Sequence, residues 1–263
     1  MATVHDILTY IHRLAPPHMM EDWDNGGLLL GRKEKLVTKI LVALDPFDAV
    51  CREAAQWGAE LIVTHHPLIF HPIKSFTGDN PLGDSILFLA EHGISAINAH
   101  TNLDCAPDGV NDALARTLGL SDIQVVSPSG TDDSGRPWGL IRSGIVETQS
   151  LESFLTVVKE TLGCQCLRYV DGGKPVHRVA VGGGACASEL ETVYAAQCDT
   201  FVTADVKYNQ FWDARDLGIN LIDAGHFHTE NPVCRVLAEK LQAAFPDITV
   251  RVSEKHCDHM KFW

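Results

Sequence analysis

Histidines and acidic residues follow three apolar segments of the sequence, and both side-chain types are common ligands of divalent metals. The three groups are the doublet His65-His66, the segment 100–104 (HTNLD) and the segment 225–230 (GHFHTE). Neutral imidazole combined with carboxylate suits Zn, Fe, Mn, Ni or Co and does not suit Ca or Mg alone. Three of these histidines together with two carboxylates already exceed the three protein ligands of one catalytic zinc. The pattern therefore favours two metal ions that share a bridging carboxylate.

Each group also has a purely structural explanation. Successive side chains diverge on extended backbone, so His65 and His66 could serve two different metals or could simply be a surface pair. Asp104 could cap a helix instead of binding a metal. Thr229 is a plausible N-cap, which would place Glu230 in the first turn of a helix, where the helix dipole favours a carboxylate.

The elements that must position these groups alternate along the chain. Apolar periodicity and glycine stops predict helices over 3–14, 46–57, 81–92, 108–118, 150–162, 188–197, 206–217 and 229–244. Short β-branched runs predict strands over 39–45, 60–64, 94–99, 138–147, 176–181, 200–203, 219–223 and 248–252. Thr3 and Asp6 resemble a capping box at the first helix. The alternation predicts an α/β fold with helices packed on mixed sheets.

Two segments on either side of a polar stretch resemble each other. AAQ at 54–56 leads into the strand before His65, and AAQ at 195–197 leads into the strand over 200–203. The polar residues 127–137 (SPSGTDDSGRP) are the best linker candidate. We therefore predict two similar α/β units, 1–126 and 138–263, a probable internal duplication with the metal site between them. In open α/β sheets, ligands gather beyond the carboxyl ends of the strands.

Composition narrows the class of protein. The chain has 263 residues and a net charge of −13, which argues against nucleic acid and against anionic membrane as partners. No apolar run reaches 18 residues, and the N-terminus lacks the features of a secretory signal. The eight cysteines form no Cys-x-x-Cys pair, so we expect reduced thiols and a cytoplasmic location.

Five strings in this order resemble the family of GTP cyclohydrolase 1 type 2 homologues, also called the dinuclear-metal, toroidal-hexamer proteins. The strings are Glu21–Asn25, Thr64–Pro67, His100–Asp104, Thr203–Tyr208 and Asp223–Glu230. The resemblance implies two α/β units, a homohexameric ring and two divalent metal ions per subunit. It implies as metal ligands His65, His66, Asp104, His226 and Glu230. It also implies that His100 lies near the metals, where we expect it to carry protons as a catalytic group. Phe227-His228 replaces the more usual Tyr-Ala, so His228 is either an added ligand or an exposed side chain.

The expected function is a metal-dependent hydrolase acting on a nucleotide or a related phosphorylated or cyclic small molecule. The alternative is a non-enzymatic metal-binding ring that acts as scaffold, metal chaperone or regulatory partner. Two weaker motifs stay open. The loop Gly182–Gly184 is either a tight turn or a set of amides for a phosphate. Trp23 either packs locally or lies on the rim of the site.

Overall fold

The computed structural model describes residues 1–263 and confirms an α/β protein with helices packed on mixed sheets. The chain folds as two compact units. Unit 1 comprises Met1–Leu103 and Cys234–Cys257, and unit 2 comprises Asp104–Val233 and Asp258–Trp263. These units differ from the predicted ones, because the chain divides at residue 104 and returns to unit 1 near its end. Residues 127–137 lie inside unit 2.

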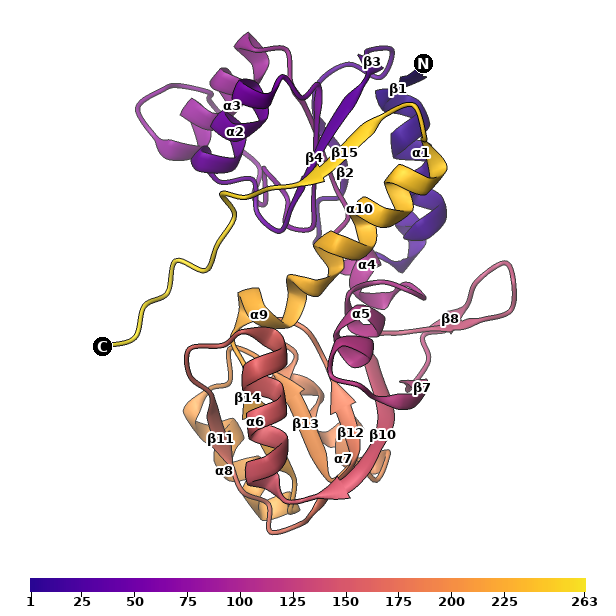
Figure 1. Ribbon diagram of the computed structural model, residues 1–263, viewed down its shortest axis with the longest axis vertical. Helices are drawn as coiled ribbons and strands as arrows, with labels where there is room; N and C mark the ends of the chain where they lie inside the picture. The colour runs from indigo at the N-terminus through magenta and orange to yellow at the C-terminus, as the bar shows by residue number, and fades with distance from the viewer. The chain divides into compact units, whose positions relative to one another are not determined.

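Unit 1 is built on a five-stranded sheet with the order β15-β4-β5-β6-β2 (Figure 1). Its strands are β15 (Thr249–Val252), β4 (Lys39–Ala43), β5 (Leu61–Thr64), β6 (Ser95–Asn98) and β2 (Gly27–Leu30). All neighbours are parallel except β2, which runs antiparallel to β6. Every residue of β5 and β6 is buried, as expected for strands covered on both faces.

Helices cover both faces of this sheet. On one face lie α2 (Asp48–Trp57) and α3 (Pro81–Glu91), and on the other α1 (Val4–Leu14) and α10 (Pro232–Ala244) (Figure 1). Thr3 and Asp6 form the predicted capping box of α1. Two short strands, β1 (Ala2–Thr3) and β3 (Leu36–Val37), pair beside it. Three consecutive residues form the 3-10 helix η1 (Pro17–Met19).

The last part of unit 1 is held by the carboxylate of Glu53, which is only 6% exposed. Glu53 accepts hydrogen bonds from the side chains of Arg251 and Ser253 and from the backbone N–H groups of residues 254 and 255. His256 then accepts a hydrogen bond at Nδ1 from the backbone N–H of Leu44 (3.2 Å). These bonds and the β15–β4 pairing explain why the C-terminal strand belongs to unit 1.

Unit 2 is built on a six-stranded sheet with the order β11-β14-β13-β12-β10-β7. Its strands are β11 (Arg168–Val170), β14 (Asn220–Asp223), β13 (Thr200–Thr203), β12 (Val176–Val181), β10 (Ile141–Gln149) and β7 (Ser121–Val126). The central β12, β13 and β14 are parallel, and the outer strands are antiparallel. The predicted linker forms a small hairpin of β8 (Gly130–Thr131) and β9 (Pro137–Trp138).

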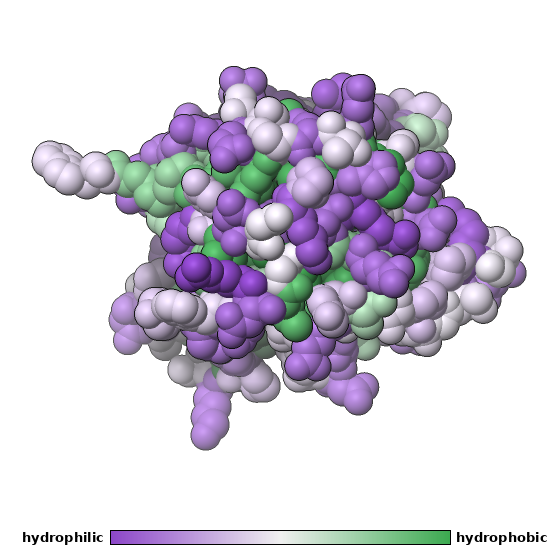
Figure 2. All heavy atoms as spheres, turned by 90° about the horizontal axis from the view of Figure 1, so that it is seen from below, coloured by the Kyte–Doolittle hydropathy of each residue, from purple (hydrophilic) through white to green (hydrophobic).

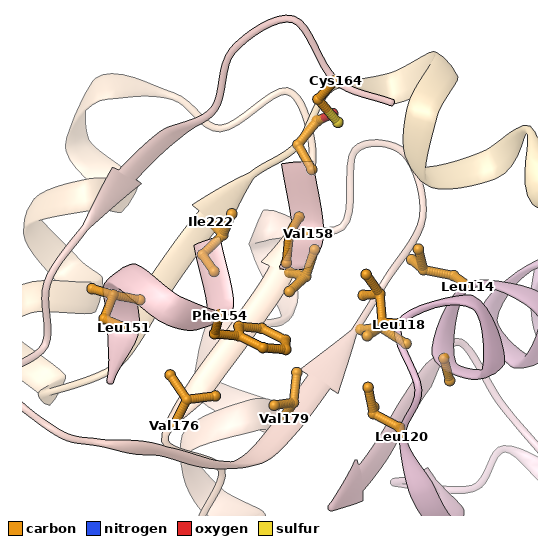
Figure 3. Packing of buried hydrophobic residues seen from close by; sticks show 14 residues of the cluster. Leu114, Leu118, Leu120, Leu151, Phe154, Val158, Cys164, Val176, Val179 and Ile222 are labelled. Carbon is orange, nitrogen blue, oxygen red and sulfur yellow. The ribbon is translucent and has the colours of Figure 1, made fainter. Parts of the chain in front are cut away.

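Alternate residues of these strands pack into two separate cores, as the two-residue period of a strand requires. Val179, Val202 and Ile222 face the core that contains Phe154 of α6 (Leu151–Leu162) and residues of α5 (Val110–Thr117) (Figure 3). Their neighbours Ala180, Phe201 and Leu221 face the opposite core. That core includes residues of α7 (Leu190–Ala195) and α8 (Tyr208–Leu217).

A buried arginine ties β10 to the start of unit 2. The side chain of Arg142 is paired with Asp112, with Nε 3.0 Å from the carboxylate oxygen. It also donates to the carbonyls of Cys105, Ala106 and Gly139. Because the guanidinium is almost fully buried, these partners satisfy donors that water cannot reach.

Several elements differ from the predictions. The predicted helix over 229–244 is two helices, α9 (His226–Glu230) and α10, while 188–197 forms the 3-10 helix η2 (Ala187–Glu189) followed by a shorter α7. The short α4 (Thr101–Cys105) and the strands β2, β7 and β11 were not predicted. Each unit has three central parallel strands, but descent from a duplication stays a prediction.

No helix is long and apolar enough to cross a membrane. Viewed from below, the lower end of unit 2 presents mainly hydrophilic residues, with hydrophobic ones confined to small areas (Figure 2). All eight cysteines are free thiols, as predicted.

Candidate metal centre

In unit 1, the predicted histidines meet at the carboxyl end of the sheet. His65 and His66 follow β5, and His100 follows β6, the parallel neighbour of β5. One ring nitrogen of each of the three lies within 4.8 Å of the others. The ring centroids are 4.9 Å apart for His65–His66, 5.2 Å for His65–His100 and 5.5 Å for His66–His100. The alternative of a loose surface pair is wrong, because His65 is fully buried.

The orientation of each ring is fixed through Nδ1. In His65 this atom lies 2.9 Å from the carbonyl oxygen of Ala99, and in His66 it lies 2.7 Å from Oδ1 of Asp45. A carbonyl or an ionised carboxylate can only accept, so Nδ1 carries the proton and Nε2 the lone pair. Metal-binding histidines have this arrangement, because the second hydrogen bond selects the tautomer and strengthens the ligand.

His100 follows the same rule with Asp24, whose Oδ1 lies 2.7 Å from Nδ1. The second oxygen of Asp24 accepts from the backbone N–H and the hydroxyl of Thr101, at 3.1 and 2.6 Å. Burial alone would raise the pKa of Asp24, but the hydrogen bonds from His100 and Thr101 outweigh it and hold the pKa well below its usual value. Asp24 is therefore an ionised partner that orients His100.

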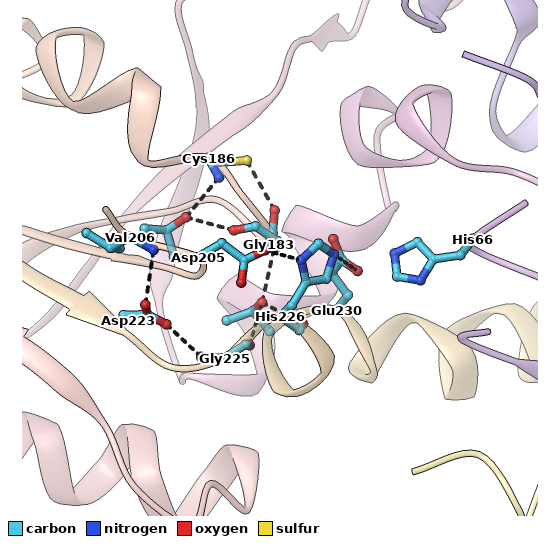
Figure 4. A network of polar contacts seen from close by, with 12 residues as sticks. His66, Gly183, Cys186, Asp205, Val206, Asp223, Gly225, His226 and Glu230 are labelled. Atoms are coloured by element: carbon cyan, nitrogen blue, oxygen red, sulfur yellow. Dashed lines mark hydrogen bonds and ion pairs between the residues drawn. The ribbon is translucent and has the colours of Figure 1, made fainter. Parts of the chain in front are cut away.

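In unit 2, the predicted residues His226 and Glu230 begin and end α9 (Figure 4). Nε2 of His226 lies 3.1 Å from Oε2 of Glu230, and its Nδ1 lies 2.7 Å from Oδ2 of Asp205. Carboxylate oxygens of Glu230 and Asp104 lie within 4.8 Å of each other. Both acidic side chains are more than nine-tenths buried. Two buried carboxylates this close repel each other unless a cation or a proton lies between them.

His226 is surrounded by negative charge. Burial alone would lower the pKa of His226, but hydrogen bonds and charge from Asp205 and Glu230 raise it to about 11. The metal-free imidazole is therefore protonated at neutral pH, and its proton occupies the place where a cation would be held. Binding of a metal at Nε2 would release that proton.

The loop Gly182–Gly184 lies against His226 and Glu230. Gly183 donates its N–H to Oδ1 of Asn111 (2.7 Å), and Gly184 donates to the hydroxyl of Thr229 (3.0 Å). The N–H of Gly182 donates to the carbonyl of Val202. These amides are used within the protein, so the loop is the tight turn of the two alternatives and offers them to no phosphate.

Gly184 also makes room for the ligands. Its φ is +65°, and a Cβ there would lie 2.2 Å from Oε1 of Glu230 and 3.1 Å from Nε2 of His226. Asn111 in turn donates from Nδ2 to the carbonyl of Asp104 (3.1 Å). The Gly182–Gly184 loop therefore positions both carboxylates: it leaves room for Glu230, and through Asn111 it holds the backbone of Asp104.

The predicted cap at Thr229 is wrong. The helix begins three residues earlier, because Gly225 adopts a positive φ of 83° and lets the chain turn directly into α9. Thr229 is instead buried and bonds the Gly184 loop. Glu230 ends α9 rather than lying in the first turn of a helix.

His228 belongs to none of the candidate ligand groups. Its Nδ1 lies 3.1 Å from the carbonyl of Leu162, and its Nε2 lies 3.4 Å from Asp258. It lines a cavity of about 390 Å³ in unit 2 that also borders Asp205 and Arg168.

Sequence reasoning included Asp205 only as part of the string Thr203–Tyr208 and missed Asp45 altogether. Asp45 follows β4 and Asp205 follows β13, so each lies at the carboxyl end of a strand adjacent to the one that precedes its histidine. Their position after a neighbouring strand could have identified both aspartates from the sequence. Asp205 holds a left-handed φ of +52°, which is costly for a residue other than glycine and common at functional sites.

Comparison with known proteins identifies the family of the chain. The profile of Duf34/NIF3 (NGG1p interacting factor 3) matches residues 2–258. A Clostridium perfringens protein named GTP cyclohydrolase 1 type 2 homolog is 32% identical over 261 residues, covering 98% of this chain and 99% of the relative. A Helicobacter pylori protein named GTP cyclohydrolase 1 type 2 is 30% identical over 248 residues, covering 92% and 93%.

A solved structure related to the same family shares the fold. A Bacillus cereus protein related to NIF3 has a crystal structure that superposes with a TM-score of 0.93 at 25% identity, covering 100% of this chain and 99% of that one. The profile match and the two relatives extend over nearly the whole sequence, which confirms the resemblance stated from the motifs. The chain belongs to the Duf34/NIF3 family.

Proposed function

We propose that this protein is a hydrolase that depends on two divalent metal ions. The observation that carries the proposal is the common setting of four imidazoles at strand ends, each with Nδ1 on an oxygen that can only accept. This setting lets the other ring nitrogen of each bind a metal or, in His100, accept a proton. The proposed ligands are His65, His66, Asp104, His226 and Glu230.

The donor set fits the proposed ions. Imidazole and carboxylate together suit Zn, Fe, Mn, Ni and Co, and the ligands exceed what one ion with an open position uses. The close carboxylates of Asp104 and Glu230 supply the negative charge that a dication would balance. Divalent ions held there would polarise a substrate oxygen and lower the pKa of a water molecule.

His100 is proposed to move the proton. Its Nδ1 is held by the ionised Asp24, so its Nε2 can accept a proton while Asp24 stabilises the resulting charge. This pairing resembles the aspartate–histidine half of a hydrolytic triad. The same ring could instead be a third imidazole ligand beside His65 and His66.

The two roles of His100 are separated by one variant. We expect His100→Ala to keep its metal by elemental analysis and to lose at least about 100-fold in turnover. Loss of metal together with turnover would make His100 a ligand. If the wild-type protein binds metal and its partners but turns over no substrate, the non-enzymatic alternative is supported.

The proposed substrate is a nucleotide or a related phosphorylated or cyclic small molecule. The printed name of the Helicobacter pylori relative makes GTP the first compound to test. A panel of nucleoside triphosphates, phosphoesters and cyclic amides extends the assay. Absence of turnover across that panel with metal-loaded protein would refute the hydrolase proposal.

Elemental analysis and mass in solution test the rest. Protein purified without added metal should carry two divalent ions per chain, and Glu230→Gln or His65→Ala should reduce that number. We propose a homohexamer, which light scattering after size exclusion measures directly. Retention of both ions by either variant would refute the proposed ligand set.

A further inference from the structure

Two aromatic side chains of unit 1 are exposed beside His100. Trp23 is 61% exposed and Phe70 is 43% exposed. The Trp23 and Phe70 rings are 5.9 Å apart, and they lie 6.2 and 6.1 Å from the ring of His100. All three contacts are edge-to-face, with interplanar angles of 62° to 78°. Aromatic rings therefore surround the histidine on its solvent side.

Hydrogen bonds hold these rings in place. Asp24, the residue after Trp23, has a fully buried side chain that binds His100 and Thr101. Asn25 donates from Nδ2 to the carbonyl of Ile69, the residue before Phe70, at 2.6 Å. The two segments are thus fixed to each other and to the end of β6, and the exposed rings are preorganised.

Local packing does not explain this arrangement. A turn that only needed to close could expose polar side chains, and exposing two large rings to water forgoes the free energy of burying them. An aromatic ring of about 150–250 Å² is instead well suited to stack on a planar partner. Both rings lie next to His100, the proposed proton carrier, so the occupant they fit is a small molecule that reacts there.

We propose that Trp23 and Phe70 bind a planar nitrogen heterocycle of the substrate by stacking, next to His100. Because the Trp23 and Phe70 rings are inclined at 62°, the heterocycle would stack face-on against one of them and meet the other edge-on, while its reacting group reaches the imidazoles of unit 1. Stacking is tolerant of ring identity, because every base has a π-face, so the pair selects planar over saturated rings. The inference rests on the proposed function for the site it serves, but the stacking itself requires no metal.

The test compares probes with and without a planar base on the full-length protein. Guanosine, adenosine and cytidine carry a planar base, and ribose, a saturated ring without a base, is the control. Saturation-transfer NMR and competition titrations report binding and affinity. We expect the base protons of at least one nucleoside to receive saturation from the wild type, and ribose to receive none.

Variants assign the binding to the rings. Trp23→Ala should weaken nucleoside binding by about tenfold or more, and Trp23→Phe should retain it within about threefold. Trp212→Ala is the matched control, because Trp212 is a similarly exposed tryptophan of α8 in unit 2. Circular dichroism and the urea midpoint verify that each variant folds.

The proposal is overturned if the wild type binds no nucleoside, or if Trp23→Ala binds as the wild type does. It is also overturned if Trp212→Ala weakens binding as much as Trp23→Ala. Elemental analysis separates this result from the proposed hydrolase. If the wild type is purified without metal and still binds nucleosides, only the metal proposal is refuted. If it is purified with metal and shows no preference for nucleosides over ribose, only the stacking proposal is refuted.

Discussion

Replacing Gly184 with alanine should move a proposed metal ligand without removing it. A Cβ at this position would lie 2.2 Å from Oε1 of Glu230, and ordinary contact begins at 3.4 Å, so the carboxylate must shift by about 1.2 Å (3.4 − 2.2). Metal–ligand distances tolerate about 0.2 Å. The shift therefore exceeds the tolerance several-fold. We expect the metal affinity to fall by about 10–100-fold or more.

The effect on folding should be smaller and separable. Gly184 has a φ of +65°, and alanine in the left-handed region costs about 1–2 kcal/mol. Gly163 has a φ of +71° with nothing within 4 Å of its Cβ, so Gly163→Ala carries the same backbone cost alone. Both variants should lower the free energy of unfolding in urea by this backbone cost, Gly184→Ala by somewhat more because the Glu230 carboxylate must also move, and only Gly184→Ala should lose metal.

Two measurements decide the outcome. Isothermal titration with Zn²⁺ or Mn²⁺ gives the affinity of each variant, and NMR of the metal-free protein follows His226. Displacing Glu230 from Nε2 should lower the pKa of His226 below its value of about 11, because one of the two carboxylates that raise it moves away. Wild-type metal affinity together with an unchanged His226 titration in Gly184→Ala would refute the reasoning.

Further variants test the surrounding structure. Asp205→Asn removes the ionised acceptor at Nδ1 of His226 and should weaken metal binding by about 10–100-fold in the same titration. Burial lowers the pKa of His256 below 6.5, so protonation opposes folding: its contribution is complete above pH 6.5 and declines as the pH falls below it. His256→Asn keeps an acceptor for the N–H of Leu44 and should make the free energy of unfolding in urea fall less steeply as the pH is lowered. The same pH dependence in the variant and the wild type would contradict this. Arg142→Ala leaves a buried carboxylate unpaired and should cost about 3–5 kcal/mol in urea, and a loss under 1 kcal/mol, about what a surface pair contributes, would contradict the buried pairing.

The fold class and most central elements could be predicted from the sequence, because they depend on local patterns. The strands at 61–64 and 220–223 are centred on the apolar residues 61–63 and 221–222, and glycines stop the helices at Gly58 and Gly218 in left-handed conformations. The edge strands were harder. β7 (SDIQVV) is largely exposed and polar, so its assignment depends on pairing with β10, which is 15 residues or more along the chain.

The unit boundaries could not be predicted for a similar reason. A polar, turn-rich segment at 127–137 has the composition of a linker, yet its residues form a hairpin within unit 2. The true division follows from long-range pairing of β15 with β4 and from the bonds of Glu53. No local pattern encodes either contact.

The grouping of the three histidines in unit 1 could be predicted from the sequence, and part of what supports the candidate site could not. His65, His66 and His100 follow adjacent parallel strands, so strand order alone predicts that they meet. Asp45 and Asp205 follow neighbouring parallel strands in the same way, so the same signal could have found them. The role of Gly184 depends on a side chain 46 residues away.

The return of the C-terminal segment to the first unit has a consequence for biosynthesis. A ribosome makes all of Asp104–Val233 before it makes β15, so unit 2 can complete its core while unit 1 still lacks its edge strand. During that interval the outer edge of β4 and the Glu53 carboxylate have no partners from the segment still to come. An unpaired strand edge is a template for association with other chains. Nascent chains that stall near the end of translation should therefore be the aggregation-prone species, and they should be a ready substrate for chaperones.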